Sequence, residues 1–472
     1  MAIGCWVHAW GDGSQHDQDF LIRKLASQGV AAEPLRHETA LRSGICIFNR
    51  ATPELRDFLQ TVSRAGQDRV IAIAGSRASR DGPGHWELLQ AGASDVVAWS
   101  DADLLAQQIA ARLERWVSVE RLLAEPTVTE LVVAKSRAWR TVLRDVVEIA
   151  RFSDATVLIL GETGTGKEVA ARLIHLLDAR PDKRDLVVLD CSTVVPELSG
   201  SEFFGHEKGA FTGALTERHG AFALADRGTL FLDEIGELSL PLQAQLLRAV
   251  HERTYKRVGG SVWHRTTFRL LCATNRDLLD LVRRGTFRAD LYYRIAGCTC
   301  RLPPLRERLE DIVPLAEHFL RQAYPDREVP ELDDAVRDYL LRREYPGNVR
   351  DLQQTVSRLV YRHAGGGTIS IGCVPPEERR VLEPTRTAWL DRHFERPIHR
   401  AVLLGAALKD IGRAAEDVAI RYATDEEGGN LQRAAHRLGV TDRALQLRRA
   451  NQRQNGVPIP LSPSTCPPTL PG

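Results

Sequence analysis

Short apolar runs and helical periods alternate along the first 120 residues. The runs typical of buried strands cover residues 5–10, 44–48, 70–74 and 96–99. Helical spacing of apolar side chains, about every 3.6 positions, covers residues 17–28, 53–65 and 102–117. Because strands that alternate with helices build parallel sheets, the pattern predicts a small α/β domain over residues 1–120.

The same alternation returns over residues 131–362. Apolar runs at residues 156–160, 186–189 and 228–232 predict strands, and residues 142–150 and 169–177 predict helices. Residues 102–123 lie between the two α/β regions and are long, charged and amphipathic. We expect this stretch to link the domains, and either to pair with its copy in a partner subunit or to form a plain surface helix.

The composition loosens after residue 365, where three glycines and then two prolines indicate a linker. Helical spacing returns at residues 408–422 and 430–438, and Gly439 ends the second stretch. Thr441 is a good N-cap for a further helix over residues 441–450. Helix, glycine turn and helix predict an all-α helix-turn-helix domain over residues 405–455. The Pro- and Ser-rich residues 456–472 are expected to be disordered.

Composition adds limits to this picture. The 472 residues suffice for about three domains, and the net charge of +1 gives no global attraction to nucleic acid or membrane. No apolar run reaches the roughly 20 residues that span a bilayer, and the first residues lack the pattern of a signal peptide. Eight scattered cysteines favour reduced thiols, so we expect a cytoplasmic protein without a membrane segment.

A glycine-rich turn follows the strand at residues 156–160 and opens a helix. Backbone N–H groups of such a turn close around a polyphosphate, and the helix start adds partial positive charge. Lys167 would reach the β and γ oxygens of ATP. The predicted phosphate contacts are Gly161, Glu162, Thr163, Gly164, Thr165, Gly166, Lys167 and Glu168.

Two carboxylates end the strand at residues 228–232. Asp233 is expected to hold Mg²⁺, and Glu234 to orient or deprotonate the attacking water. A glycine turn alone is often only a loop, and Glu168 stands where the usual motif has Ser or Thr. The turn and the two acids together, in this order, predict an ATP-hydrolysing site.

Residues 203–214 then carry the string Gly209-Ala-Phe-Thr-Gly-Ala214. This string resembles the hallmark of the AAA+ activators that act on sigma-54 RNA polymerase. Glycines at both ends permit sharp turns, and an exposed Phe211 and Thr212 suit contact with another protein. The resemblance implies that Gly209, Ala210, Phe211, Thr212, Gly213 and Ala214 bind sigma-54. Glu168 fits the same family, which carries Glu at this place.

Three further segments resemble the family in order, at residues 269–276, 285–294 and 345–352. The resemblance implies that Asn275 senses the γ-phosphate and that Arg350 reaches the phosphates from a helical lid. Arg288 and Arg294 would reach the nucleotide of the neighbouring subunit, where guanidinium stabilises the charge that develops on the phosphoryl group. Asp190 departs from the family's Asn, and we hypothesise that this change weakens the switch that restrains Glu234.

Residues 1–120 resemble the receiver domains of two-component regulators, most visibly at residues 91–99. Receivers need acids after the first strand, an Asp after the third and a Lys after the fifth. Here Trp10, Asn49 and Trp99 stand at those places. An amide does not accept phosphate as a carboxylate does, so we expect a degenerate receiver that serves for contacts or a ligand.

The helix-turn-helix resembles the Fis-type DNA-binding domain that closes most sigma-54 activators. Its arginines supply the local positive field that the whole chain lacks. The candidate DNA-binding residues in the recognition helix are Arg443, Gln446, Arg448 and Arg449.

Together these features predict an α/β protein with a receiver-like domain, an AAA+ P-loop ATPase with a helical lid and a helix-turn-helix. It is expected to bind enhancer DNA upstream of sigma-54 promoters, to assemble from dimers into a ring, by analogy a hexamer, and to remodel the sigma-54 RNA polymerase holoenzyme with ATP and Mg²⁺. One alternative is a AAA+ chaperone or loader with a DNA-binding tail. Another is a repressor with an inactive ATPase.

Overall fold

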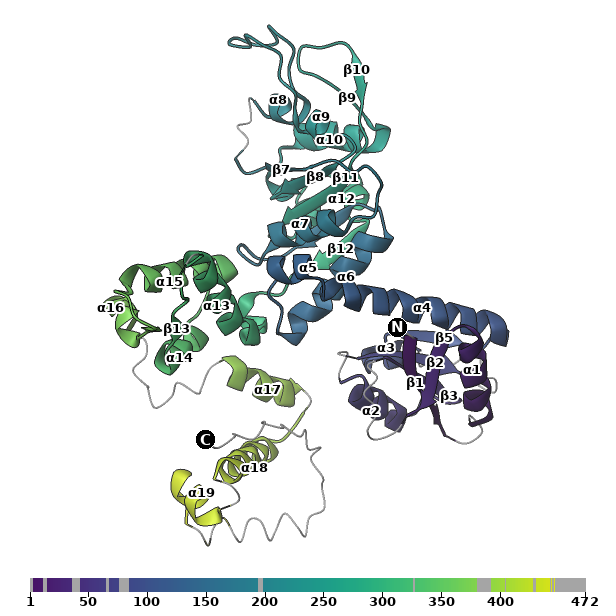
Figure 1. Cartoon of the computed structure of the whole chain (residues 1–472), viewed down its shortest axis with the longest axis vertical. Coiled ribbons are helices and arrows are strands. Elements are labelled where there is room, and N and C mark those ends of the chain that lie inside the picture. The colour runs from purple at the N-terminus through teal and green to yellow at the C-terminus, as the bar shows by residue number, and fades with distance from the viewer. Residues whose placement is uncertain are drawn as a thin grey trace. The chain divides into compact units, whose positions relative to one another are not determined.

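The computed structural model describes residues 3–11, 15–35, 43–64, 68–75, 85–193, 198–325, 327–379, 392–403, 405–427, 430–441, 443 and 445. The chain forms two compact units, Met1–Glu378 and Arg379–Gly472. The first unit contains both predicted α/β regions and the lid, whose elements are labelled in Figure 1. Within the described residues, no helix combines the length and the hydropathy needed to span a bilayer.

The N-terminal region folds around a parallel sheet with strand order β2-β1-β3-β4-β5. Its strands are β1 (Ile3–Trp10), β2 (Val30–Pro34), β3 (Ser43–Phe48), β4 (Arg69–Ala74) and β5 (Asp95–Ala98), and its helices are α1 (Gln15–Ser27), α2 (Pro53–Val62), α3 (His85–Gln90) and the first part of α4 (Ala102–Leu123). The predicted receiver-like parallel sheet is confirmed. Sequence reasoning missed β2 and α3.

Alternate residues of each strand enter opposite cores, as the pleat of a strand requires. Cys5 and Val7 of β1 pack with α1 and α4, whereas Trp6 packs on the other face with α2 and α3. The helix α4 continues past the first domain, so that its Val119 belongs to the core of the second α/β region. The linking role that the sequence predicted for residues 102–123 is therefore carried by packing at both ends of one helix.

The second α/β region contains a parallel sheet with strand order β12-β6-β11-β8-β7. Its strands are β6 (Val157–Leu160), β7 (Leu186–Asp190), β8 (Thr229–Asp233), β11 (Arg269–Thr274) and β12 (Cys298–Arg301). The helices are α5 (Pro126–Leu131), α6 (Arg137–Phe152), α7 (Lys167–Leu177), α8 (Ser199–Phe204), α9 (Ala221–Leu224), α10 (Leu240–Glu252), α11 (Leu278–Arg283) and α12 (Ala289–Ile295), and a hairpin joins β9 (Thr254–Lys256) to β10 (Trp263–Arg265).

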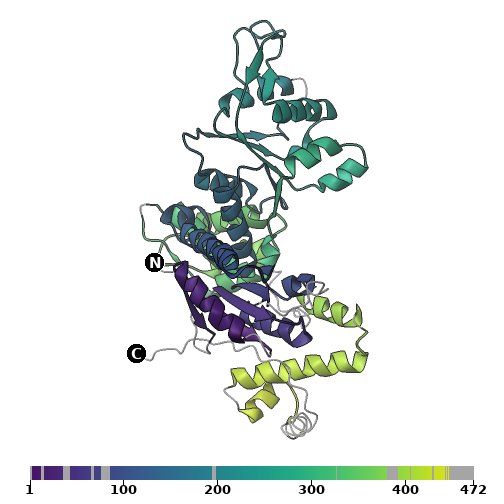
Figure 2. The same cartoon turned by 90° about the vertical axis from the view of Figure 1, so that its right-hand side faces the viewer.

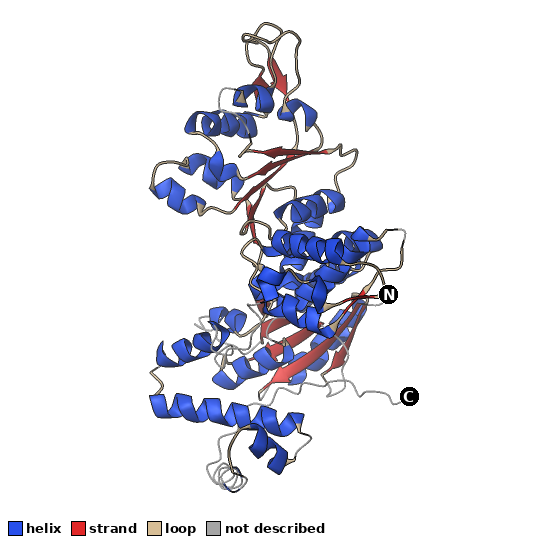
Figure 3. Cartoon of the chain, turned by 90° about the vertical axis from the view of Figure 1, so that its left-hand side faces the viewer, coloured by secondary structure: helices blue, strands red, loops and turns tan. Residues whose placement is uncertain are grey.

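Helices cover both faces of this sheet (Figure 3), and side chains alternate between two cores. Val157 and Ile159 of β6 face α6 and α7, while Leu158 faces the opposite core. Burial on both faces explains why these strands appear in the sequence as nearly continuous apolar runs. The polar residues that follow the strands are thereby gathered at the carboxyl edge of the sheet.

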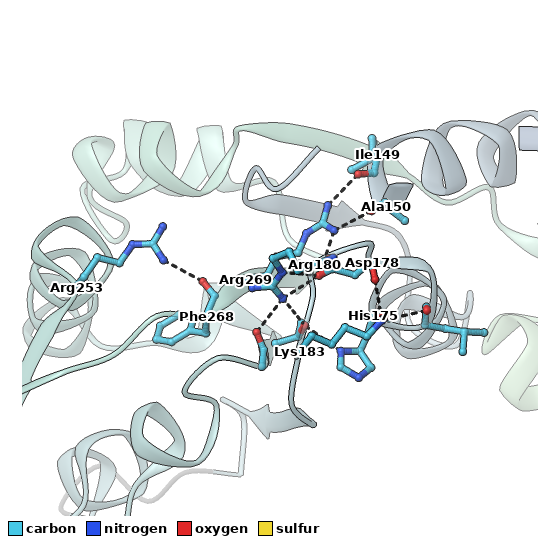
Figure 4. A network of polar contacts seen from close by, with 12 residues as sticks. Ile149, Ala150, His175, Asp178, Arg180, Lys183, Arg253, Phe268 and Arg269 are labelled. Carbon is cyan, nitrogen blue, oxygen red and sulfur yellow. Dashed lines mark hydrogen bonds and ion pairs between the residues drawn. The ribbon is translucent and has the colours of Figure 1, made fainter. Parts of the chain in front are cut away.

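A buried polar network fastens the opposite edge of the sheet (Figure 4). Arg269, the first residue of β11, is almost wholly buried, and its guanidinium donates to the carbonyl oxygens of Ile149 and Ala150 at 2.9 and 3.1 Å. It also lies 3.6 Å from Asp178, which Arg180 binds at 2.8 Å. The network satisfies carbonyl groups at the last turn of α6, which would otherwise lack partners.

The lid follows β12 and is helical, as predicted. It contains α13 (Ile312–Ala323), α14 (Asp334–Arg342), α15 (Asn348–Arg362) and α16 (Pro376–Arg379), with the short parallel pair β13 (Glu331–Leu332) and β14 (Thr368–Ile369). Two short 3₁₀ turns, η2 (Leu305–Glu307) and η3 (Leu309–Asp311), lead into it.

Every regular element among the described residues of the second unit is a helix. It contains α17 (Arg392–Leu403), α18 (Leu408–Glu426) and α19 (Leu431–Arg437). Asn430 caps α19 by accepting from the N–H groups of Gln432 and Arg433, and Gly439 turns the chain with a φ of 67°. Ala423, Ala434 and Leu445 form a small buried core. The first helix and the turn of the predicted motif are therefore present, and most of residues 441–450 lies outside the described residues.

Candidate active site

The phosphate loop runs from the end of β6 to the first turn of α7. Gly164 and Gly166 have φ angles of 77° and 105°, which favour glycine strongly. A Cβ at Gly164 would also lie 2.1 Å from the carbonyl oxygen of Gly347. Glycine at 164 is therefore required by both the turn and the packing of the loop.

Glu168 is the second residue of α7, and its side chain contacts α7 itself and not the phosphate loop. Its carboxylate accepts from Arg172 at 2.7 Å on the exposed face of the helix. The phosphate contact of Glu168 stays a prediction, and its backbone N–H at the helix start is the group that could make it.

Lys167 and Glu234 meet across the site. The Lys167 side chain is buried, and its Nζ donates to Glu234 Oε1 at 3.0 Å and to the carbonyl oxygen of Gly161 at 3.2 Å. Glu234 has a φ of 50°, in a region that costs a residue of this kind about 1–3 kcal/mol. The fold thus holds the carboxylate of Glu234 beside the phosphate loop at the expense of backbone strain.

Asn275 completes this group from the end of β11. Its backbone N–H donates to Glu234 Oε2 at 3.2 Å, and its Nδ2 donates to Thr163 Oγ1 at 3.2 Å. Since β11 lies between β6 and β8, the order of the strands places these three residues together. Sequence spacing alone does not reveal this neighbourhood.

Asp233 lies half-buried at the end of β8. Burial raises its pKa, Lys167 opposes the shift, and the charges of Glu234 and Asp190 add to it. Its Oδ1 accepts from the N–H of Glu234 at 3.0 Å. A cation close to Asp233 would therefore stabilise the charged form of its carboxylate.

Asp190 is paired with Asp233 across β7 and β8. Its Oδ1 accepts from the backbone N–H and the hydroxyl of Ser192 at 2.9 and 2.7 Å. Ser192 therefore holds the Asp190 carboxylate. The hypothesis that Asp190 weakens a switch on Glu234 stays a prediction.

The loop at residues 209–214 is closed on itself. The N–H of Gly209 donates to the carbonyl oxygen of Ala214 at 2.8 Å, and the N–H of Ala214 donates to that of Phe211 at 3.0 Å. The Phe211 ring lies 4.9 Å from the ring of buried His206 and is 37% exposed. The Phe211 ring at the predicted tip thus packs on His206 and is still accessible to solvent.

This loop emerges at the same end of the domain as the β9–β10 hairpin (Figure 2). The N–H of Glu207 donates to the carbonyl oxygen of Val258 at 3.0 Å, and Arg257 binds Glu207 and Glu217 at 3.3 and 3.2 Å. The residues that flank the loop at 209–214 are therefore bonded to the connection between β9 and β10.

Comparison with known proteins agrees with this arrangement. Residues 132–301 match the family described as the sigma-54 interaction domain, and residues 306–388 match the AAA+ ATPase lid domain. The transcriptional regulatory protein ZraR of Klebsiella oxytoca is 40% identical over 427 residues, which are 89% of this chain and 91% of ZraR. The chain belongs to the family of sigma-54-dependent transcriptional regulators.

Two further relatives of this sigma-54-dependent regulator widen the comparison. The regulatory protein AtoC of Escherichia coli (strain K12) is 39% identical over 316 residues, 66% of each chain. The crystal structure of NtrX from Brucella abortus in complex with ADP is 23% identical, with a TM-score of 0.50 and coverage of 97% of this chain and 100% of that one. NtrX thus shares the fold, and the regulator's central domain is an AAA+ ATPase.

The two candidate arginines for a neighbouring subunit flank α12. Arg288 is its N-cap, and its guanidinium binds Asp290 at 2.7 and 3.0 Å. Arg294 lies in the last turn and, with the exposed Tyr293, lines an open cavity of about 550 Å³ between α10 and α12. Both side chains lie at the surface of the regulator's ATPase domain.

In the regulator's receiver-like domain, Asn49 follows β3 and Trp99 follows β5. A Cβ at Gly75 would lie 2.7 Å from Asn49 Oδ1 and 3.1 Å from Asp17 Oδ2, so the Asn49 amide and the buried Asp17 lie close together. Asp12, the other acid near the first strand, lies outside the described residues. The loss of phosphotransfer stays a prediction that these positions support.

Of the candidate DNA-binding residues, Arg443 is described and exposed. Gln446, Arg448 and Arg449 lie outside the described residues. The regulator's α19 adds Arg433 and Arg437, and Arg437 binds Glu427 at 3.1 Å.

Three residues that touch the phosphate loop were not singled out from the sequence, namely Arg306, Arg308 and Asn348. Arg306 binds both carboxylate oxygens of Glu162 at 2.6 and 2.8 Å, and this contact lowers the pKa of Glu162. All three stand in segments that match the regulator family, but nothing in their spacing indicates a partner at the loop.

Proposed function

We propose that this regulator binds ATP at residues 161–168, hydrolyses it in a ring of subunits and uses the energy to remodel the closed complex of sigma-54 RNA polymerase. The observation that carries the proposal is the joint presence of two features in one domain. Lys167, Glu234 and Asn275 meet beside the phosphate loop, and the aromatic-tipped loop at residues 209–214 projects from the same domain.

In the proposed site, Lys167 and the loop backbone bind the phosphates, and Glu234 takes the proton of the attacking water or orients it. Mg²⁺ would be held by Asp233, where it would neutralise charge on the phosphate oxygens. The donor set supports this assignment, because Mg²⁺ usually takes one or two carboxylates plus phosphate oxygens. Among the described residues, no group of three or more His, Cys, Asp or Glu side chains forms a metal cage that would compete for this role.

Ring assembly would complete each site with Arg288 and Arg294 of the adjacent subunit, an effect of about 10³–10⁵ in rate for arginines supplied in this way. The exposure of both side chains, and the place of Arg294 in the lining of an open cavity, support the assignment. A mixture of Lys167→Ala and Arg294→Ala chains tests it. Each variant alone should be inactive, and the mixture should regain turnover at junctions that pair two intact halves.

The helix-turn-helix would bind upstream DNA as a dimer, with Arg443 close to the base edges. The basic side chains of α19 support this role through the phosphate backbone. Arg443→Ala should weaken specific binding more than non-specific binding, measured at one fixed salt concentration.

Transcription in vitro from a sigma-54 promoter, with ATP and the purified chain, tests the whole proposal. Thr212→Ala should retain ATPase activity and lose open-complex formation, because it changes the projecting tip and leaves the nucleotide site intact. Thr141→Ala, on the exposed face of α6, is the matched control and should retain both. ATP turnover without any nucleotide-dependent grip on sigma-54 would instead favour a remodelling ATPase with another partner.

A further inference from the structure

Three successive carbonyl groups of the phosphate loop are held by residues from the lid and from the turns that lead into it. The oxygens of Thr163, Gly164 and Thr165 accept from Asn348 Nδ2 at 3.0 Å, from the N–H of Val349 at 2.9 Å and from Arg308 Nη2 at 2.7 Å. These donors lie outside the segment that a phosphate-loop motif covers.

The direction of these carbonyls decides where the loop's N–H groups point. In a planar trans peptide, the C=O and the N–H point to opposite sides. A donor that holds the carbonyl of Thr163 therefore turns the N–H of Gly164 the other way, and the bond to Thr165 does the same for Gly166. Such N–H groups are the ones with which a glycine loop binds phosphate.

Asn348 is built for this contact. Its side chain is 1% exposed, its Oδ1 accepts from the N–H of Leu305 at 2.8 Å, and its Nδ2 also donates to Glu162 Oε2 at 3.2 Å. Its φ of 53° lies in the left-handed region, which Asn tolerates better than most residues. The first residue of a helix needs neither a left-handed φ nor a buried side-chain amide with all these hydrogen bonds. The start of α15 alone therefore does not explain Asn348.

Arg308 is equally enclosed, with 2% of its surface exposed and its guanidinium 4.6 Å from the ring centre of Trp139. Burial lowers its pKa to about 10 and Asp311 opposes the shift, so Arg308 is charged at neutral pH. Asp311 in turn accepts from the N–H and hydroxyl of Ser136 at 2.7 and 2.6 Å. The loop, the start of α6 and the entrance to the lid are therefore bonded into one unit.

We propose that Asn348 and Arg308 are positioning residues, which hold the phosphate loop in its nucleotide-binding shape and tie it to the lid segment that carries Arg350. Arg350 lies two positions after Asn348, and its Cβ would be 3.1 Å from a Cβ at Gly164. Any movement of α15 therefore displaces the loop and Arg350 together. This inference rests on the proposed binding of ATP at residues 161–168.

Asn348→Gly in the full chain is the first test, because glycine keeps the φ angle and removes the amide. We expect the KM for ATP to rise at least about tenfold, as the loss of the two hydrogen bonds from Asn348 Nδ2 to Glu162 and Thr163 implies, with kcat within about threefold. Gln353→Gly, on the exposed face of α15, is the matched control for a glycine in this helix. It should lower the Tm and leave the KM within about twofold, since a glycine in the interior of a helix costs stability only.

Two further variants sharpen the test. Asn348→Asp keeps the shape but points a carboxylate at Glu162 and at the Thr163 carbonyl, so its KM should exceed that of Asn348→Gly. Arg308→Lys keeps the charge and loses the planar donor, and should raise the KM on its own. Because Asn348 acts partly by placing Arg350, Asn348→Gly and Arg350→Ala should combine to less than the product of their separate effects on KM.

A KM within twofold of the parent in both Asn348→Gly and Arg308→Lys would overturn the inference, and so would a loss confined to kcat. If the Asn348 variants do not fold, Arg308→Lys decides alone. The proposed function fails differently: the unmodified chain would then show no ATP turnover beyond that of Lys167→Ala.

Discussion

The N-terminal domain and the ATPase domain each enclose a five-stranded parallel sheet, and the two sheets differ in strand order and in the residues at their carboxyl edge. Both bury alternate side chains in two cores, and in both the carboxyl ends of neighbouring strands meet at one edge. In open parallel sheets this edge is where ligands bind. Each domain therefore has the scaffold of a site.

The residues at that edge are of opposite kinds. In the ATPase, strand ends and the adjoining loop carry Lys167, Asp233 and Glu234, which are charged and in contact. In the receiver-like domain, the corresponding strand ends carry Asn49 and Trp99. The comparison teaches that a parallel sheet can carry very different residues at its carboxyl edge, because the cores that hold the fold use other residues.

The largest expected effect comes from replacing an acid by an amide in the active sheet. Glu234→Gln should lower ATP turnover by about 10²–10⁴, the contribution of a general base, while ATP binding persists. Steady-state ATPase assays and ATP titration measure the two quantities. Glu130→Gln, on an exposed position of α5, controls for the loss of one charge and should stay within about twofold. Normal turnover in Glu234→Gln would show that Glu234 is not the general base of ATP hydrolysis.

The second prediction compares the first residues of two strands. Arg269 of β11 is fully buried with Asp178, and Arg69 of β4 is partly exposed and lies 3.7 Å from Glu148. Arg269→Met should lower the free energy of unfolding by about 3–5 kcal/mol, because it leaves a buried carboxylate with one partner fewer. Arg69→Met should cost less, about 1–2 kcal/mol, because the Arg69 side chain is 13% exposed and Glu148 keeps Arg115 as a partner at 2.7 Å. Urea unfolding measures both free energies. Equal losses of stability in the two variants would contradict the prediction that the buried Arg269 contributes more than Arg69.

Much of the fold follows from the sequence because burial on two faces leaves strong apolar runs. The expected strands at residues 5–10, 44–48 and 70–74 lie within β1, β3 and β4. The strand β2 was missed because only Val30 of its five residues is buried, and α3 was missed because six residues give too short a helical period. The strands that the sequence predicted best are therefore those that form continuous apolar runs, including the partly exposed β5 and β7.

The site was predictable only where its residues are neighbours in the chain. The phosphate loop and the pair Asp233–Glu234 each form one short motif. Asn348 bonds to Thr163 across 185 positions, and Arg308 bonds to Thr165 across 143. No periodicity or motif spacing encodes such a contact, which exists only after the lid has folded against the loop.

A third prediction concerns the receiver-like core. The Trp6 ring lies flat over Gly44, and a Cβ there would be 1.9 Å from Trp6 Cε2. Gly44→Ala should destabilise the N-terminal domain by about 1–3 kcal/mol, the cost of overpacking a filled core. Gly367→Ala, where a Cβ meets nothing within 4 Å, should change stability little. Thermal unfolding followed by tryptophan fluorescence distinguishes them, and a neutral Gly44→Ala would mean that this core is loosely packed.

The smallest expected effect comes from placing a carboxylate at the carboxyl edge of the N-terminal sheet. Asn49→Asp supplies the acceptor that a receiver needs, but Trp99 still occupies the place of the lysine and Trp10 ends the strand that should lead to acids. Phosphoryl transfer to a carboxylate requires a cation to neutralise the developing charge. We therefore expect no stable phosphate adduct on residues 1–120, in either the parent or Asn49→Asp, after incubation with a small phosphodonor and intact-mass analysis. An adduct on Asn49→Asp alone would show that the missing carboxylate is the one obstacle to phosphate acceptance by the N-terminal domain. An adduct on the parent would show that this domain accepts phosphate without a carboxylate at residue 49.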